Sequence, residues 1–267
     1  MKKITYIRFI VLGLVILFAT LLNKTAPFGQ VKGLSDSAKN KAIRGLVIPH
    51  HGLAGGLITE SIELLRQNRN DYQILVIIGP NHFYKESYTL TSSTKLQDTA
   101  VDSEFIEKLK EMFPKTVLDQ DIVGAEHAVT TAASYFTEYF PKSRIIPLVI
   151  SPYFTEESLR TIADFLSQNL PRNTLYVASV DFSHNLLTDE SLVNNEESIK
   201  TIRSFDFPTL FKYTDSHMDS PASVALVMLV MQNLKTTNWT TVESLHSGLI
   251  LNDPTIQGTS YVTGIFY

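Results

Sequence analysis

Short β-branched runs that alternate with amphipathic segments constrain the fold of this chain more than any other feature of its sequence. The runs at residues 45–48, 74–78 and 174–180 have the length of strands, and the second is continuously apolar, as in a strand buried on both faces. Segments 57–67 and 156–168 carry apolar residues at helical spacing. This alternation predicts an α/β fold with a largely parallel central sheet and helices on both faces.

The remainder of the chain continues the pattern. Helices are expected at residues 102–112, 128–140, 189–204 and 221–234, and strands at residues 88–91, 145–150, 240–245 and 261–267. Pro147 interrupts one of these strands, which favours an edge position or a bulge because proline donates no ladder hydrogen bond. Residues 43–267 are long enough to form a single α/β domain, preceded by a polar linker at residues 25–42.

The N-terminus resembles a targeting signal. Lys2, Lys3 and Arg8 precede an apolar stretch at residues 9–22, the pattern of a signal anchor or a signal peptide within residues 1–24. This pattern predicts a transmembrane helix that associates with a membrane, and a domain that is extracytoplasmic, either anchored or exported after cleavage. The alternative is a buried helix of the domain itself, and the absence of a polar face in the stretch argues against it.

Composition excludes several classes of protein. The chain has no cysteine, so disulfides, thiolate metal sites and a cysteine nucleophile are excluded. A net charge of −4 and scattered basic residues give no indication of a nucleic-acid partner. No dinucleotide-binding glycine motif, Walker A motif, hydrolase nucleophile elbow or H-E-x-x-H zinc motif is present.

Histidines follow three of the expected strands. His50, His82 and His184 each lie just beyond an apolar run, and Asp181 stands three residues before the last of them. In a parallel sheet these strand ends share one edge, where ligands usually bind, so the side chains are expected to converge. Imidazole is a common ligand of zinc, copper and iron. One histidine at a strand end is usually a hydrogen-bonded turn residue, but three of them favour a functional pocket. His51 and His246 are weaker candidates, whereas Glu126 and His127, in the loop entering a helix, join the pocket.

Five motifs in order resemble those of one family. Val47-Ile-Pro-His50-His-Gly52 with Gly56 resembles the P-H-A-G-x-x-x-S-G opening of the Memo-like family, which includes the Memo component, protein B, of AmmeMemoRadiSam systems. The later matches are Gly79-Pro-Asn-His82, Glu126-His127, Ser179-Val-Asp181-Phe-Ser-His184 and Gly258-Thr-Ser-Tyr261. The resemblance runs from about Gly45 to Tyr267.

The resemblance implies a fold similar to class III extradiol dioxygenases, in which two histidines and a carboxylate hold a non-haem iron. It implies that His50 and His82 are metal ligands and that Asp181 and His184 line the same pocket. The family's third ligand, a cysteine late in the chain, is missing here. We expect Asp219 to replace it, with His217 as the alternative, although Asp219 or Ser220 could instead cap the helix that begins at Pro221.

Three functions are compatible with these residues. The leading one is a metal-binding, dioxygenase-like oxidoreductase that uses a divalent metal, Fe(II) or copper before zinc, with Asp181, His184, His127 and Glu126 as candidate catalytic residues. The second is a non-catalytic module that binds a small molecule or peptide in the same pocket. The third is a zinc-dependent hydrolase. The sequence names no substrate.

Overall fold

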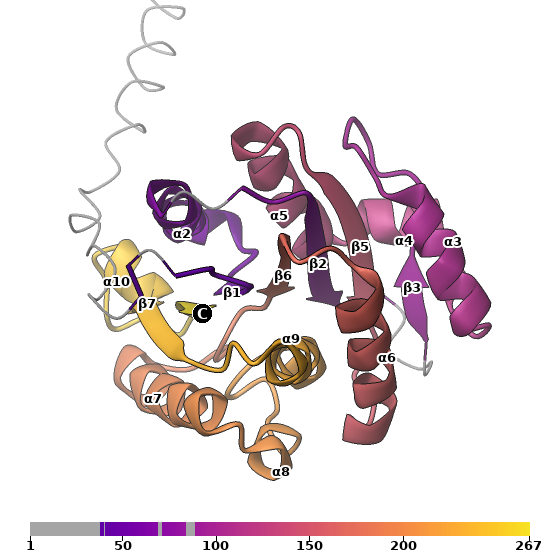
Figure 1. Ribbon diagram of the computed structural model, residues 1–267. Coiled ribbons are helices and arrows are strands. Elements are labelled where there is room, and N and C mark those ends of the chain that lie inside the picture. The colour runs from indigo at the N-terminus through magenta and orange to yellow at the C-terminus, as the bar shows by residue number, and fades with distance from the viewer. Residues whose placement is uncertain (1–37, 40, 69–70, 84–88) are drawn as a thin grey trace, which may run out of the picture. The chain divides into compact units, whose positions relative to one another are not determined.

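Eight strands form one mixed sheet in the order β4-β3-β5-β2-β6-β1-β8-β7 (Figure 1). The computed structural model describes residues 38–39, 41–68, 71–83 and 89–267, which all belong to one unit spanning residues 33–267. The strands are β1 (Gly45–Ile48), β2 (Ile74–Pro80), β3 (Leu90–Ser92), β4 (Val117–Leu118), β5 (Arg144–Ile150), β6 (Thr174–Ser179), β7 (Trp239–His246) and β8 (Ser260–Phe266).

The centre of the sheet is parallel and its flanks are mixed. Strands β5, β2, β6 and β1 run parallel to one another, whereas β3 pairs antiparallel with β5, and β8 pairs antiparallel with both β1 and β7. The predicted α/β fold with a largely parallel central sheet is therefore confirmed. Because the four central strands point the same way, the loops after β1, β2 and β6 leave the sheet at a common edge.

Helices cover both faces of the sheet and create two separate cores (Figure 1). One core contains side chains of α3, α6, α7, α8 and α9, and the other contains side chains of α2, α4 and α5. The bounds are η1 (Gly52–Ala54), α2 (Gly55–Gln67), α3 (Ser103–Met112), α4 (Gln120–Ala125), α5 (His127–Tyr139), α6 (Glu156–Asn169), α7 (Thr188–Ser204), α8 (Phe207–Leu210), α9 (Pro221–Leu234) and α10 (Ser247–Ile250).

Pro147 does not mark an edge strand. Strand β5 lies inside the sheet, where Pro147 pairs with Ile77 of β2 and its carbonyl accepts a hydrogen bond from Ser92 Oγ at 2.7 Å. The pairing between β5 and β3 ends one residue away, at the pair Leu148 and Ser92. The backbone N–H that Pro147 lacks would therefore face a position that β3 no longer occupies, which explains why the sheet tolerates a proline there.

The prediction of a membrane anchor is corrected. A membrane-spanning helix needs about 20 consecutive apolar residues. In the part of the chain that the structure describes, no helix is long and apolar enough to cross a membrane, and the apolar helix α9 has 14 residues. Residues 1–24 lie outside the described residues. The signal anchor, the membrane partner and the extracytoplasmic location thus gain no support, and we withdraw them.

Candidate metal centre

His50 is held at the end of β1 by β6 and the loop that follows it. Its backbone N–H donates to Asp181 Oδ1 at 3.0 Å, and its ring Nδ1 lies 3.2 Å from the Ser179 carbonyl oxygen. A carbonyl only accepts, so this contact requires the hydrogen on Nδ1. The Nε2 atom is then left facing the edge of the sheet. The residue is 3% exposed, so its ring belongs to the interior.

His82 is held at the end of β2 by Glu126. Its backbone N–H donates to Glu126 Oε2 at 2.9 Å and its ring Nδ1 lies 2.7 Å from Glu126 Oε1. Glu126 also caps α5 by accepting the Ala128 N–H at 3.1 Å. Gly79 permits this arrangement, because a Cβ at that position would lie 2.8 Å from the Cβ of Ala128. The buried carboxylate thus ties the loop after β2 to the start of α5 and leaves His82 Nε2 available.

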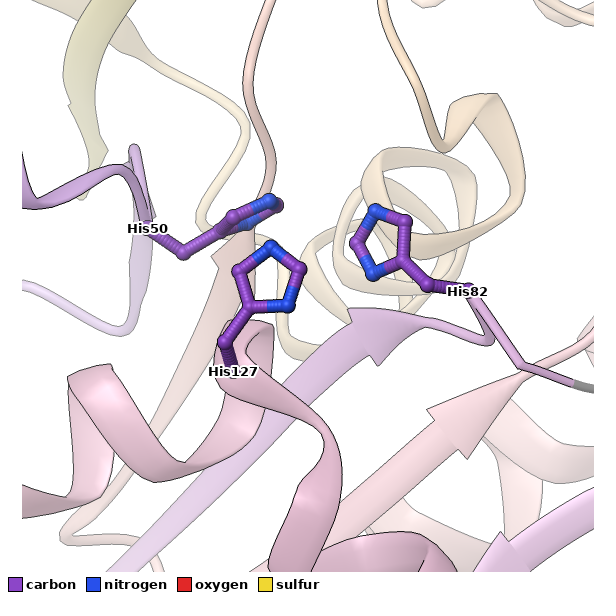
Figure 2. Close-up of side chains that lie close together, drawn as sticks. All are labelled: His50, His82 and His127. Carbon is purple, nitrogen blue, oxygen red and sulfur yellow. The ribbon is translucent and has the colours of Figure 1, made fainter.

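Three imidazole rings meet at this edge (Figure 2). The ring centroids of His50 and His82 are 5.4 Å apart, and the His127 ring lies 4.9 Å from His50 and stacks 4.5 Å from His82. One ring nitrogen from each of the three histidines lies within 4.8 Å of the others, so the group could hold a metal ion. Histidine 127 begins α5 and is the most exposed of the three.

Asp219 approaches the same rings from the loop before α9. Its Oδ2 atom lies 3.3 Å from His50 Nε2 and 3.8 Å from His82 Nε2. An isolated bridge between Phe182 and Met218, and an Asp219 N–H bond to the Asp181 carbonyl at 3.1 Å, fix the position of this loop. Ser220, and not Asp219, caps α9 by accepting the Ser223 N–H. Both carboxylate oxygens of Asp219 are buried without a hydrogen-bond partner among the described residues.

The charges at this edge are strongly coupled. Burial opposes protonation of His82, yet Asp219 and Glu126 outweigh burial and raise the pKa of His82 to about 9. Burial also opposes the negative charge of Asp219, but the His50 and His82 rings reverse that effect and lower its pKa to about 2. Since neither oxygen of Asp219 has hydrogen-bond geometry, we read its approach to the rings as a contact between charges.

The pKa values of three other residues at this edge also depend on burial and on neighbouring charges. The pKa of His50 is raised, because Asp219 and Asp181 outweigh burial. The pKa of Asp181 is raised by burial. The pKa of His127 is lowered, by burial and by the two neighbouring rings. Protonation of His50 and His82 is therefore favoured where their Nε2 atoms face the Asp219 carboxylate.

A cavity of about 400 Å³ opens beside these residues. His82, Asp219 and His184 contribute to its wall, and the Nδ1 atom of His184 is buried without a hydrogen-bond partner among the described residues. The backbone N–H of His184 donates to the Asp215 carbonyl at 2.8 Å. The other lining residues are Pro80, Asn81, Ile150, Pro152, Asn185, Asp215 and Ser220.

The structure does not bring every candidate to the cluster. His217 stacks on Tyr213 at 4.1 Å, and its Nε2 lies 3.2 Å from Glu197 on α7. His246 caps α10 by accepting the Gly248 N–H, and His51 Nδ1 lies 2.6 Å from the Tyr261 hydroxyl. These three rings make structural contacts instead of joining the group.

Sequence reasoning missed one feature of the site. The Ser179 carbonyl sets the tautomer of His50. A backbone carbonyl carries no residue signature, so no pattern could have indicated it. His127, which the sequence placed in the pocket, lies against the other two rings because β2 and α5 approach each other closely at Gly79.

Comparisons with known proteins agree with this architecture. A family model described as Memo-like protein matches residues 21–264. A MEMO1 family protein of Metallosphaera sedula is 22% identical to this chain over 192 residues, which cover 68% of each chain. A MEMO1 family protein of Nitrosopumilus maritimus is 23% identical over 254 residues, which cover 91% of this chain and 87% of that protein. A crystal structure of an uncharacterized protein from Escherichia coli K12 has a TM-score of 0.53 at 15% identity, and the match covers 84% of this chain and 99% of that one.

Proposed function

This chain belongs to the Memo-like family, and from that premise we propose that it binds one divalent metal ion between His50, His82 and Asp219. The observation that carries the proposal is the Asp219 carboxylate, whose two buried oxygens have no hydrogen-bond partner among the described residues. Two groups bound to a common ion at about 2.1 Å stand roughly 3.0–3.4 Å apart. The 3.3 Å between Asp219 Oδ2 and His50 Nε2 falls in that range, and the 3.8 Å to His82 Nε2 requires only a small adjustment.

The partners of the two rings also favour a metal. A metal-binding histidine usually donates its other ring N–H to a carbonyl or carboxylate, which fixes the ring and its tautomer. Ser179 and Glu126 make these contacts with His50 and His82. Two histidines and one carboxylate form the face that suits Fe(II) and leaves coordination positions open, and copper is the second choice. Such an ion, when bound, would supply Lewis-acid and redox chemistry to a ligand in the cavity.

The chain's own residues would act on that ligand from the cavity wall. His184 presents an unpartnered Nδ1 that can accept or donate a proton. Asp181 keeps His50 and Asp219 in place through its side chain and its backbone carbonyl. Glu126 orients His82, and His127 lies at the exposed side of the cluster with a lowered pKa that favours its neutral form. We propose a dioxygenase-like oxidoreductase as the function that this arrangement supports best.

His127 supports a second candidate. A set of three histidines without Asp219 suits zinc, and a zinc-bound water would make the site hydrolytic. Metal content distinguishes the candidates. We expect purified protein to hold one ion per chain, Asp219→Asn to lose it, and His127→Gln and His217→Gln to keep it. Loss in His127→Gln with retention in Asp219→Asn would favour the zinc site. No bound metal in folded protein would favour a non-catalytic module that binds a small molecule or peptide.

A further inference from the structure

We propose that the ligand of this cavity is a small molecule with a cationic amino group, recognised by Asp215 and Asn185 beside His184. This inference rests on the proposed metal site, because it assumes that the other end of the ligand faces His82 and Asp219. It adds the charge and the polarity of the ligand, which the metal ligands do not determine.

The charged residues of the cavity wall are the first argument. Two carboxylates, Asp215 and Asp219, line the cavity, and no lysine or arginine is among its described lining residues. Asp219 is 9% exposed and directed at the histidines. Asp215 is exposed, and no described residue forms a hydrogen bond or ion pair with its carboxylate. Its backbone carbonyl accepts the His184 N–H, which keeps Asp215 beside the wall of the cavity.

The conformation of Asn185 is the second argument. Its φ of 58° is left-handed, a conformation that is costly for most residues and that asparagine adopts more readily than other non-glycine residues. Hydrogen bonds hold the residues on both sides: His184 bonds to Asp215, and Leu186 exchanges bonds of 3.4 and 2.9 Å with Gly258. No described residue bonds to the Asn185 side chain, so its amide oxygen is available at the cavity wall. Residues held this way are common at ligand-binding positions.

Part of the lining is apolar. Pro80, Ile150 and Pro152 offer surface to the body of a ligand, and a volume of about 400 Å³ accommodates a small molecule. An ammonium group beside Asp215 would pair with its carboxylate and donate to Asn185. A carboxylate there would face Asp215, and no lysine or arginine among the described lining residues would compensate its charge, which disfavours anionic ligands.

Three hydroxamates of equal length test the proposal. Hydroxamate binds divalent metals, and the remote end is an ammonium in ω-aminopentanohydroxamate, a methyl in hexanohydroxamate and a carboxylate in the monohydroxamate of adipate. Binding of each to Zn²⁺-loaded, full-length protein is measured by calorimetry. An exposed ion pair contributes up to about 1 kcal/mol, so we expect the ammonium probe to bind about fivefold more tightly than the methyl probe, and the carboxylate probe to bind most weakly.

Matched variants separate the possible results. Asp215→Asn keeps the shape of the side chain and should abolish the preference for ammonium. Asp121→Asn removes the same charge from an exposed position on α4, outside the cavity lining, and should leave the preference intact. If the methyl probe binds no better with Zn²⁺ than without it, the metal site fails and this inference with it. If that binding depends on Zn²⁺ but ammonium is not preferred, or the preference survives Asp215→Asn, only the amine inference is overturned.

Discussion

Replacing Glu126 with glutamine tests whether one buried carboxylate serves both the fold and the metal site. Glu126 accepts three hydrogen bonds: two from His82, at 2.9 and 2.7 Å, and one from the Ala128 N–H at 3.1 Å. Glutamine has almost the same shape, but one of its two terminal atoms is a donor. Whichever way the amide is turned, at least one of the three N–H groups therefore faces another donor.

The expected loss follows from these contacts. One buried donor left unsatisfied costs about 1–3 kcal/mol, and removing the charge weakens the two remaining bonds and the interaction with the start of α5 by up to about 1 kcal/mol. His82 is 26% exposed, so we take the lower part of the combined range, about 1–2 kcal/mol. For a domain of this size that corresponds to a fall in melting temperature of roughly 2–8 °C. Metal affinity should fall about 10- to 100-fold, as when other orienting partners of metal-bound histidines are removed.

Thermal unfolding of the metal-free protein and a metal titration against a competing chelator measure the two effects separately. The pKa of Glu126 is lowered, because its contacts with His82 outweigh burial. The stability that its charge contributes is thus present above the ordinary pKa of glutamate and is lost as the pH falls through the lowered value, so the variant and the parent should converge in acid. Asp119→Ala removes the cap of α4 and should cost about 1 kcal/mol without changing metal affinity.

Two results would refute this reasoning in different ways. A variant that loses stability but keeps its metal affinity would make Glu126 a helix cap only. A variant that retains both would mean that His82 needs no acceptor at Nδ1, and the argument from ring orientation would then fail for this site.

Three further predictions address other parts of the molecule. Metal affinity should increase with pH up to about 9, because the ion must displace the proton that Asp219 helps to hold on His82, and calorimetry measures the protons released on binding. The metal-free protein should lose stability as the pH rises from about 6.5, the pKa of histidine in the unfolded chain, to about 9, the pKa of His82 in the folded protein. Gly264→Ala should lower the free energy of unfolding by about 3 kcal/mol or more, because the added Cβ would lie 2.2 Å from an indole carbon of Trp239. Gly124→Ala is the control: its added Cβ enters open space, so the free energy of unfolding should be unchanged or increase by up to about 1 kcal/mol. His217→Gln should cost no more than about 1 kcal/mol in urea unfolding, because the ring packs at the surface.

The elements of the fold could be predicted from local patterns. The helix at residues 221–234 has the bounds of α9, because Pro221 suits a first helical turn and an apolar run follows it. Asp102 caps α3, which follows it as the expected helix at residues 102–112. The order of the strands could not be predicted, because pairing depends on contacts between distant segments. Pro147 illustrates this dependence on distant contacts. The sequence shows that the residue lacks a backbone donor, but its place inside the sheet depends on where β3 ends.

The convergence of the histidines was predictable for a related reason. Parallel strands share an edge, so residues that follow β1, β2 and β6 lie along it, and they meet because these three strands are neighbours in the sheet. The partners of each ring were not predictable, because they come from 44 residues away for His82 and 129 residues away for His50. The sequence indicates which side chains gather, and the long-range packing decides which atom of each ring is left free.

The position of the proposed third ligand is set by strand pairing. The sequence left His217 as the alternative to Asp219, but the bridge between Phe182 and Met218 directs Met218 into the core. The next residue, Asp219, then lies beside Asp181, whose side chain already holds the backbone of His50. In our proposal one short bridge therefore selects a carboxylate for the site of a chain without cysteine. An oxygen ligand is harder than a thiolate and favours Fe(II) over Cu(I), which would give the proposed metal preference a structural origin.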